Sequence, residues 1–191
     1  MGGVPHLALV TLTLPPDFQA ADAAEVYRGL HDAASAFKVT LGGGDIVGSP
    51  VLSITVALSG WALEDGGRPV VLRRDAARAG DVVAVTGQLG AAAGGVRLVV
   101  QGPDFDAPGH PESEDELRSA QHRPQPRVAL GQVGLEAGLR CGMDGSDGLV
   151  QDLGHIAAAR GVAIRIEAGA VPVSGDLRVV FPGEAIAMAL T

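Results

Sequence analysis

The chain has 191 residues, of which 47% are hydrophobic, and it carries a formal net charge of −8. This length and apolar content suffice for a sizeable core and exclude a disordered chain. The acidic balance argues against nonspecific binding to nucleic acid or to an anionic membrane, so neither is expected as a partner.

The first seventy residues alternate apolar strands with one helix. Ala20–Phe37 carries apolar residues at helical spacing, which predicts an amphipathic helix. Strands are predicted at His6–Leu14, Lys38–Leu41, Val51–Leu58 and, as a short further strand, Val70–Leu72. The second of these strands is expected to run into a glycine-rich loop, Gly42-Gly43-Gly44-Asp45, and residues 61–69 are expected to form a turn-rich connection.

A second group of elements begins near Arg73. Strands are predicted at Asp81–Val85 and Val162–Glu167, and helices are predicted at about 91–100, 127–139, 146–160 and 183–190. Residues 101–118 are polar and contain prolines, which predicts a surface loop with one helical turn. Strands and helices alternate without long runs of either, so the predicted fold class is mixed α/β, or α+β.

The segment Asp144-Gly145-Ser146-Asp147-Gly148 carries the most distinctive chemistry of the chain. Its carboxylates stand beside backbone that glycine leaves bare, just before a predicted helix that Ser146 is expected to cap. Oxygen ligands next to free N–H groups suit a hard divalent cation and the phosphates bound to it, so Asp144 and Asp147 are candidate magnesium ligands. The alternative is that both acids only stabilise the positive end of the helix.

The glycine-rich loop that ends at Asp45 offers similar chemistry. Its glycines would let backbone amides approach a phosphate, and Asp45 would hold the metal that the phosphate also touches, although Gly-Asp pairs are common in ordinary turns. A guanidinium at Arg73 or Arg74 would pair with phosphate or remain a solvated surface group. The chain has no Walker A sequence, which excludes a P-loop. His155 is interpreted as a packing or hydrogen-bonding residue.

The expected cellular location follows from cysteine usage and from the apolar segments. Cys141 is the single cysteine, which excludes an intrachain disulfide and a cysteine zinc cage and is compatible with a reducing cytoplasm. The first residues lack the basic start of a signal peptide, and no apolar run approaches the ~20 residues of a membrane span. A cytoplasmic protein is therefore expected.

Together these motifs resemble the thiamine-monophosphate kinase family over essentially the whole chain. The matching segments are Gly43-Gly44-Asp45 after a strand, Arg74–Asp81, Val85–Gly90, Pro124–Arg127 and Asp144–Ile156, of which the last is the most specific. The resemblance implies a two-domain architecture like that of aminoimidazole ribonucleotide synthetase. Residues 1–72 would belong to an N-terminal domain that binds ATP and magnesium and dimerises through its sheet, and residues 73–191 to a C-terminal α/β domain.

The resemblance also implies an activity, the ATP-dependent phosphorylation of thiamine monophosphate to thiamine diphosphate by a homodimer. By position, Asp45, Asp144 and Asp147 would ligate magnesium. The residues that would contact ATP are Gly44, Asp45, Arg74 and Ser146. No catalytic nucleophile is expected from the protein, because magnesium and in-line geometry supply most of the catalysis in phosphoryl transfer.

The chain also departs from the family pattern. An acidic metal-binding segment expected before Met1 and a Gly-Gly-Glu-Asp motif expected after Thr191 are not in the sequence, and Ile46-Val47-Gly48 replaces a Thr-Thr-Arg type sequence. We therefore expect a central fragment, with an incomplete N-terminal domain and a truncated C-terminal domain, that has little or no kinase activity by itself. The alternatives are another ATP-using member of the superfamily (aminoimidazole ribonucleotide synthetase, selenophosphate synthetase or a hydrogenase-maturation protein) and a non-catalytic remnant that binds nucleotide or only dimerises.

Overall fold

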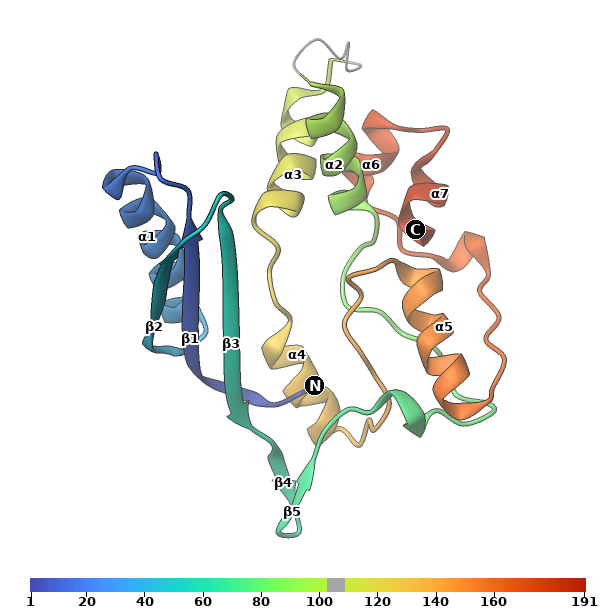
Figure 1. Ribbon diagram of the computed structural model, residues 1–191. Helices are drawn as coiled ribbons and strands as arrows, with labels where there is room; N and C mark the ends of the chain where they lie inside the picture. The colour runs from blue at the N-terminus through green and yellow to red at the C-terminus, as the bar shows by residue number, and fades with distance from the viewer. Residues whose placement is uncertain (103–108) are drawn as a thin grey trace. The chain divides into compact units, whose positions relative to one another are not determined.

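The computed structural model describes residues 1–102 and 109–191, which form two compact units (Figure 1). One unit comprises Gly2–Val70, and the other comprises Met1 together with Val71–Thr191. Helices and strands are both present, so the predicted mixed α/β class is confirmed. The assignment of two domains to residues 1–72 and 73–191 stays a prediction. No helix in the described ranges is long and apolar enough to cross a membrane.

The unit of Gly2–Val70 is built on a three-stranded sheet in the order β2-β1-β3. Its elements are β1 (Val4–Leu14), α1 (Ala20–Ala36), β2 (Thr40–Gly48), β3 (Ser53–Trp61) and the hairpin strands β4 (Leu63–Asp65) and β5 (Arg68–Val70). β1 runs parallel to β2 and antiparallel to β3. Parallel strands need a crossover connection, and α1 supplies it between β1 and β2 (Figure 1).

Burial alternates along β1 and shows which face of this sheet is inside. Ala8, Val10 and Leu12 are at most 3% exposed, whereas Leu9 between them is 46% exposed. Successive side chains of a strand point to opposite faces, so the three buried residues share one face. Because α1 is the single helix of this fully described unit, we infer that this is the face that α1 covers.

The segment Gly42–Asp45 is part of a strand and not the predicted loop. β2 continues through it and pairs with β1, so that Gly44 lies opposite Val10 and Asp45 lies opposite Thr11. A Cβ atom at Gly44 would lie 1.7 Å from the Val10 carbonyl oxygen, so only glycine lets the two backbones come this close. Glycine at this position therefore serves strand pairing, which a prediction based on glycine content missed.

The unit of Val71–Thr191 is mainly helical. Its elements are the short 3-10 turns η1 (Arg74–Ala76) and η2 (Ala168–Ala170) and the helices α2 (Ala91–Gln101), α3 (Pro111–His122), α4 (Val128–Glu136), α5 (Leu149–Arg160), α6 (Gly175–Val180) and α7 (Ala185–Leu190). One apolar cluster joins α2, α3, α6 and α7, which lie together in Figure 1. Leu98, Leu117 and Leu177 are fully buried in it. Gly94 and Gly95 allow this packing, because a Cβ at either position would come within 2.7 Å of a neighbouring atom.

Three predictions for this unit are wrong. Asp81–Val85 and Val162–Glu167 are not strands in the structure, and Val82 is 91% exposed. Apolar, β-branched segments form a strand only where a neighbouring strand supplies hydrogen bonds. The predicted loop 101–118, which lies partly outside the described residues, contains the first turns of α3. Pro111 at the start of α3 and the acids in its first turn favour a helix there.

Candidate functional site

The acidic segment 144–148 lies directly before the N-terminus of α5. The helix begins at Leu149 with Gly148 as its N-cap, at a φ of 108° that favours glycine, so the predicted cap at Ser146 is wrong. The Ser146 hydroxyl instead donates a hydrogen bond to Oδ2 of Asp144 over 2.8 Å. The two side chains are thus held together ahead of the helix, where its positive end favours anions.

Asp147 is positioned by α5 itself. Its backbone N–H donates to Oδ2 of Asp152 over 3.2 Å, and Asp152 lies in the first turn of the helix with only 4% of its surface exposed. The Asp147 side chain is exposed. The buried carboxylate therefore fixes the backbone of the segment and leaves the carboxylate of Asp147 available to a ligand.

The turn that carries Arg74 packs against the same helix. η1 contacts α5, and Nε of Arg160 near the end of α5 donates to the carbonyl oxygen of Ala77 over 3.2 Å. In the described part of the chain, the guanidinium of Arg74 is exposed and has no hydrogen-bond or ion-pair partner. It is therefore free to bind an anion.

Arg73, the other candidate for phosphate, is already engaged. Its Nε and Nη2 donate to the two carboxylate oxygens of Asp75 over 2.8 and 2.5 Å. This hydrogen bonding lowers the pKa of Asp75 and raises the pKa of Arg73. The two arginines therefore differ in the structure, and the difference agrees with the choice of Arg74 that the family resemblance implies.

Gly44 and Asp45 belong to the unit of residues 2–70. Asp45 is exposed on β2, and its Oδ1 accepts a hydrogen bond from the N–H of Ile46 over 2.8 Å. The remaining predicted site residues lie in the other unit: Arg74, Asp144, Ser146 and Asp147. A magnesium ion shared between Asp45 and the acids at 144 and 147 stays a prediction.

A group of candidate metal ligands in the described residues was not predicted from the sequence. Asp147, Asp152 and His155 each offer one ligand atom, and these atoms all lie within 4.8 Å of one another. His155 is exposed and is not packed in the core. The signal that could have revealed the group is the three-residue spacing from Asp152 to His155, which places two donors on one face of a helix.

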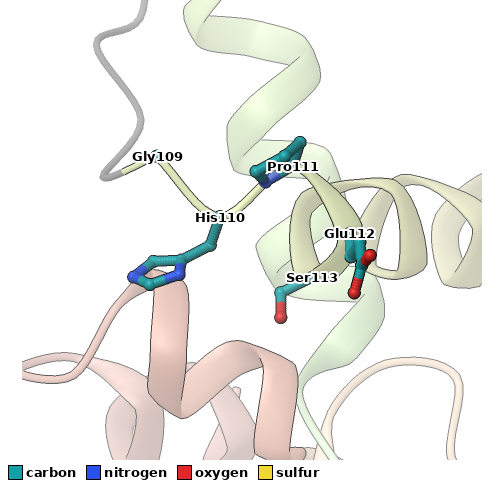
Figure 2. A pocket seen from close by; sticks show the side chains of 5 residues that line it. All are labelled: Gly109, His110, Pro111, Glu112 and Ser113. Carbon is teal, nitrogen blue, oxygen red and sulfur yellow. The ribbon is translucent and has the colours of Figure 1, made fainter.

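Two of the hollows on the described part of the helical unit can be compared with the predicted site. One, of about 290 Å³, is lined by Gly109, His110, Pro111, Glu112 and Ser113 at the start of α3. Figure 2 shows the imidazole of His110 pointing away from the carboxylate of Glu112, so these groups do not form a joint site. The other, of about 250 Å³, is lined by Asp147, Val150, Gln151, Leu190 and Thr191. Only the second hollow borders a predicted site residue.

A family model, curated relatives and solved structures match this chain, and they agree with one another. Residues 1–62 match the family model described as AIR synthase related protein, N-terminal domain. The thiamine-monophosphate kinase of Bacillus subtilis is 32% identical over 95% of this chain and 54% of its own length. The structure of thiamine-monophosphate kinase from Stenotrophomonas maltophilia K279a is 37% identical with a TM-score of 0.85 over 100% of this chain and 58% of that one. AaThiL complexed with AMPPCP and TMP is 31% identical with a TM-score of 0.87 over 99% and 59%.

These findings confirm the predicted resemblance and the architecture that goes with it. The chain is similar to thiamine-monophosphate kinases along almost its whole length and has an AIR synthase-like fold. It spans about half the length of the curated relatives that it matches.

Proposed function

We propose that this chain is part of an ATP-dependent kinase that phosphorylates thiamine monophosphate to thiamine diphosphate. The observation that carries the proposal is the similarity, over 95% of the chain, to a protein named for this activity. The match to AaThiL complexed with AMPPCP and TMP, over 99% of the chain, supports an ATP-type nucleotide and TMP as ligands of this fold.

The residues before α5 have the chemistry that a magnesium–nucleotide site needs. Asp144 and Asp147 present exposed carboxylate oxygens, which are the ligands that magnesium prefers. The Ser146 hydroxyl holds the carboxylate of Asp144, and the Asp152 carboxylate holds the backbone of Asp147. The carboxylate of Asp144 and the backbone of Asp147 are thereby held before any ligand arrives. Magnesium at these oxygens would neutralise charge on the phosphates.

Arg74, Gly44 and Asp45 complete the proposed set of nucleotide contacts. The unpaired guanidinium of Arg74 suits two-point recognition of a phosphate. The exposed carboxylate of Asp45 is a further candidate magnesium ligand, and Gly44 precedes it on β2. These roles are transferred by position from the family pattern and are supported by the exposure of both charged side chains.

The proposal is tested by calorimetric titration of the 191-residue chain with AMPPCP in the presence of magnesium. We expect saturable binding that Asp144→Asn weakens at least about tenfold, since even indirect contacts to a metal are worth ~10–100-fold in affinity. Asp115→Asn, at an exposed acid near the start of α3, is the matched control and should bind normally. An unmodified chain that binds no AMPPCP would refute the proposal. If Asp144→Asn binds AMPPCP normally, the two acids only stabilise the positive end of the helix, where they contribute about 1 kcal/mol to the free energy of unfolding.

We also propose that the complete protein is a homodimer formed through the sheet. Ile54, Val56 and Leu58 of β3 lie opposite the buried residues of β1 and therefore share their face, yet they are 46–59% exposed, so α1 leaves this strand uncovered. An apolar strip of this kind on a sheet is typical of a contact surface.

A cytoplasmic location, expected from the single cysteine, also stays a proposal.

A further inference from the structure

We propose that Asp147, Asp152 and His155 form a binding site for a divalent first-row transition ion such as Mn²⁺, which binds there without nucleotide. Two carboxylates and one imidazole each place a ligand atom within 4.8 Å of the others. Two ligands about 2.1 Å from one ion are themselves about 3.4 Å apart in a tetrahedral site and about 4.2 Å apart when they lie opposite each other. Small side-chain rotations thus suffice to close this group around an ion.

The unsatisfied carboxylate of Asp152 is the second observation that indicates an ion. Asp152 is buried, and in the described part of the chain its Oδ1 has no hydrogen-bond partner. Its Oδ2 accepts a hydrogen bond from the backbone N–H of Asp147. A buried charged oxygen without a partner is costly, and buried charges are normally paired or bound to metal. A cation held between these residues supplies the missing partner.

The local fold keeps the donors together. Asp152 and His155 are three residues apart on α5 and so lie on one face of the helix. The hydrogen bond from Asp147 to Asp152 brings the third donor back onto that face. Two carboxylates also offset the positive end of the helix dipole, which would otherwise disfavour a cation here.

The donor set selects the kind of ion. Magnesium prefers oxygen ligands and gives up its water reluctantly. Imidazole suits ions such as Zn²⁺, Fe²⁺ and Ni²⁺, and Mn²⁺, which favours carboxylate oxygens as magnesium does, is the weakest-binding transition ion that this mixed set would take. The site therefore differs from the magnesium–nucleotide site proposed above, although the two share Asp147. Asp144 contributes to the nucleotide site alone, which makes the two proposals separable by experiment.

The test is a titration of the tag-free chain with Mn²⁺ in the absence of nucleotide. The electron paramagnetic resonance signal of free Mn²⁺ is measured, and its decrease gives the amount of bound ion. Mn²⁺ is chosen because thiolate ligands bind it weakly, so that Cys141 does not contribute. We expect one ion per chain, with affinity reduced at least about tenfold in His155→Ala and in Asp152→Asn. His110→Ala removes an exposed histidine from the same unit and is the matched control with unchanged binding.

Three outcomes would refute the proposed transition-ion site. These are the absence of saturable Mn²⁺ binding, unchanged binding by His155→Ala, and displacement of Mn²⁺ by an equal concentration of Mg²⁺. Since His155 is exposed, its replacement should leave the fold intact, which circular dichroism checks, so the test holds even where Asp152→Asn fails to fold. Asp144→Asn should retain Mn²⁺ binding while losing AMPPCP binding, and this separates failure of one proposal from failure of the other.

Discussion

Replacing Gly95 with alanine should destabilise the helical unit, although alanine is the better helix former. Gly95 is buried in α2, where a Cβ atom would lie 2.2 Å from the carbonyl oxygen of Leu117 and 2.8 Å from Cβ of Gln121, both on α3. To restore ordinary contact distances, α3 would have to move away by about 1 Å, against a tightly packed core. Leu117 itself is fully buried, so this movement disturbs the centre of the apolar cluster.

Two opposing contributions set the magnitude. A change from glycine to alanine in a helix interior gains up to about 1 kcal/mol. Overpacking a core typically costs about 1–3 kcal/mol, and the cost here belongs at the upper end because the closest atom is main chain and not the end of a flexible side chain. We therefore expect Gly95→Ala to lower the free energy of unfolding by about 2 kcal/mol.

Gly154 provides the matched control for this change. It is an exposed position inside α5, and a Cβ there would have no neighbour within 4 Å among the described residues. Only the helix propensity remains, so Gly154→Ala should raise the free energy of unfolding by about 0.5–1 kcal/mol. Urea unfolding followed by far-ultraviolet circular dichroism measures both changes. If Gly95→Ala proves as stable as the original chain, the reasoning from close helix contact is refuted.

Two further predictions concern charge and association. Arg73→Gln should raise the pKa of Asp75 toward its ordinary value, because the hydrogen bond from Arg73 is the largest cause of its lowering. Because the folded-state pKa is lowered, the stability due to this pair is present above the unfolded-state pKa of about 3.9 and is lost as the pH falls through the folded-state value. An NMR titration of the Asp75 carboxyl carbon that shows no shift in the variant would contradict this. Val56→Glu should convert a dimer of this chain into a monomer, because a charge buried in an apolar contact is costly, and light scattering that finds the variant as dimeric as the original chain would contradict the proposed contact.

The elements that the sequence predicted correctly are those whose signal lies within the segment itself. β1 is rich in apolar and β-branched residues, and α1 carries apolar residues at helical spacing. α3 was not recognised because Leu117 is its only buried residue, so a mostly polar helix shows no apolar stripe. The valine-rich segment Asp81–Val85 predicts a strand, but strand formation depends on a neighbour that local sequence does not show.

The same distinction, between signals within a segment and contacts with other segments, applies to the residues of the candidate site. The acids at 144 and 147 are candidates from the sequence alone, because glycine and aspartate in close succession have a local meaning, and their role stays a prediction. The residue types alone do not separate Arg73 from Arg74, and only the family resemblance indicates Arg74; the pairing of Arg73 with Asp75 is a contact that local sequence does not reveal. Asp152 was not recognised, because an acid in the first turn of a helix has the same sequence signal whether it is exposed or buried.

Asp152 connects the two proposed sites, and its two roles can be separated by the choice of replacement. As a hydrogen-bond acceptor it holds the backbone of Asp147, and as a charged oxygen it would ligate the transition ion. Asparagine keeps an acceptor oxygen but removes the charge, so Asp152→Asn should preserve the segment and AMPPCP binding while it weakens Mn²⁺ binding. Alanine removes both functions and should weaken both ligands. Equal loss of AMPPCP binding in the two variants would mean that charge at this position, and not the hydrogen bond, supports the nucleotide site.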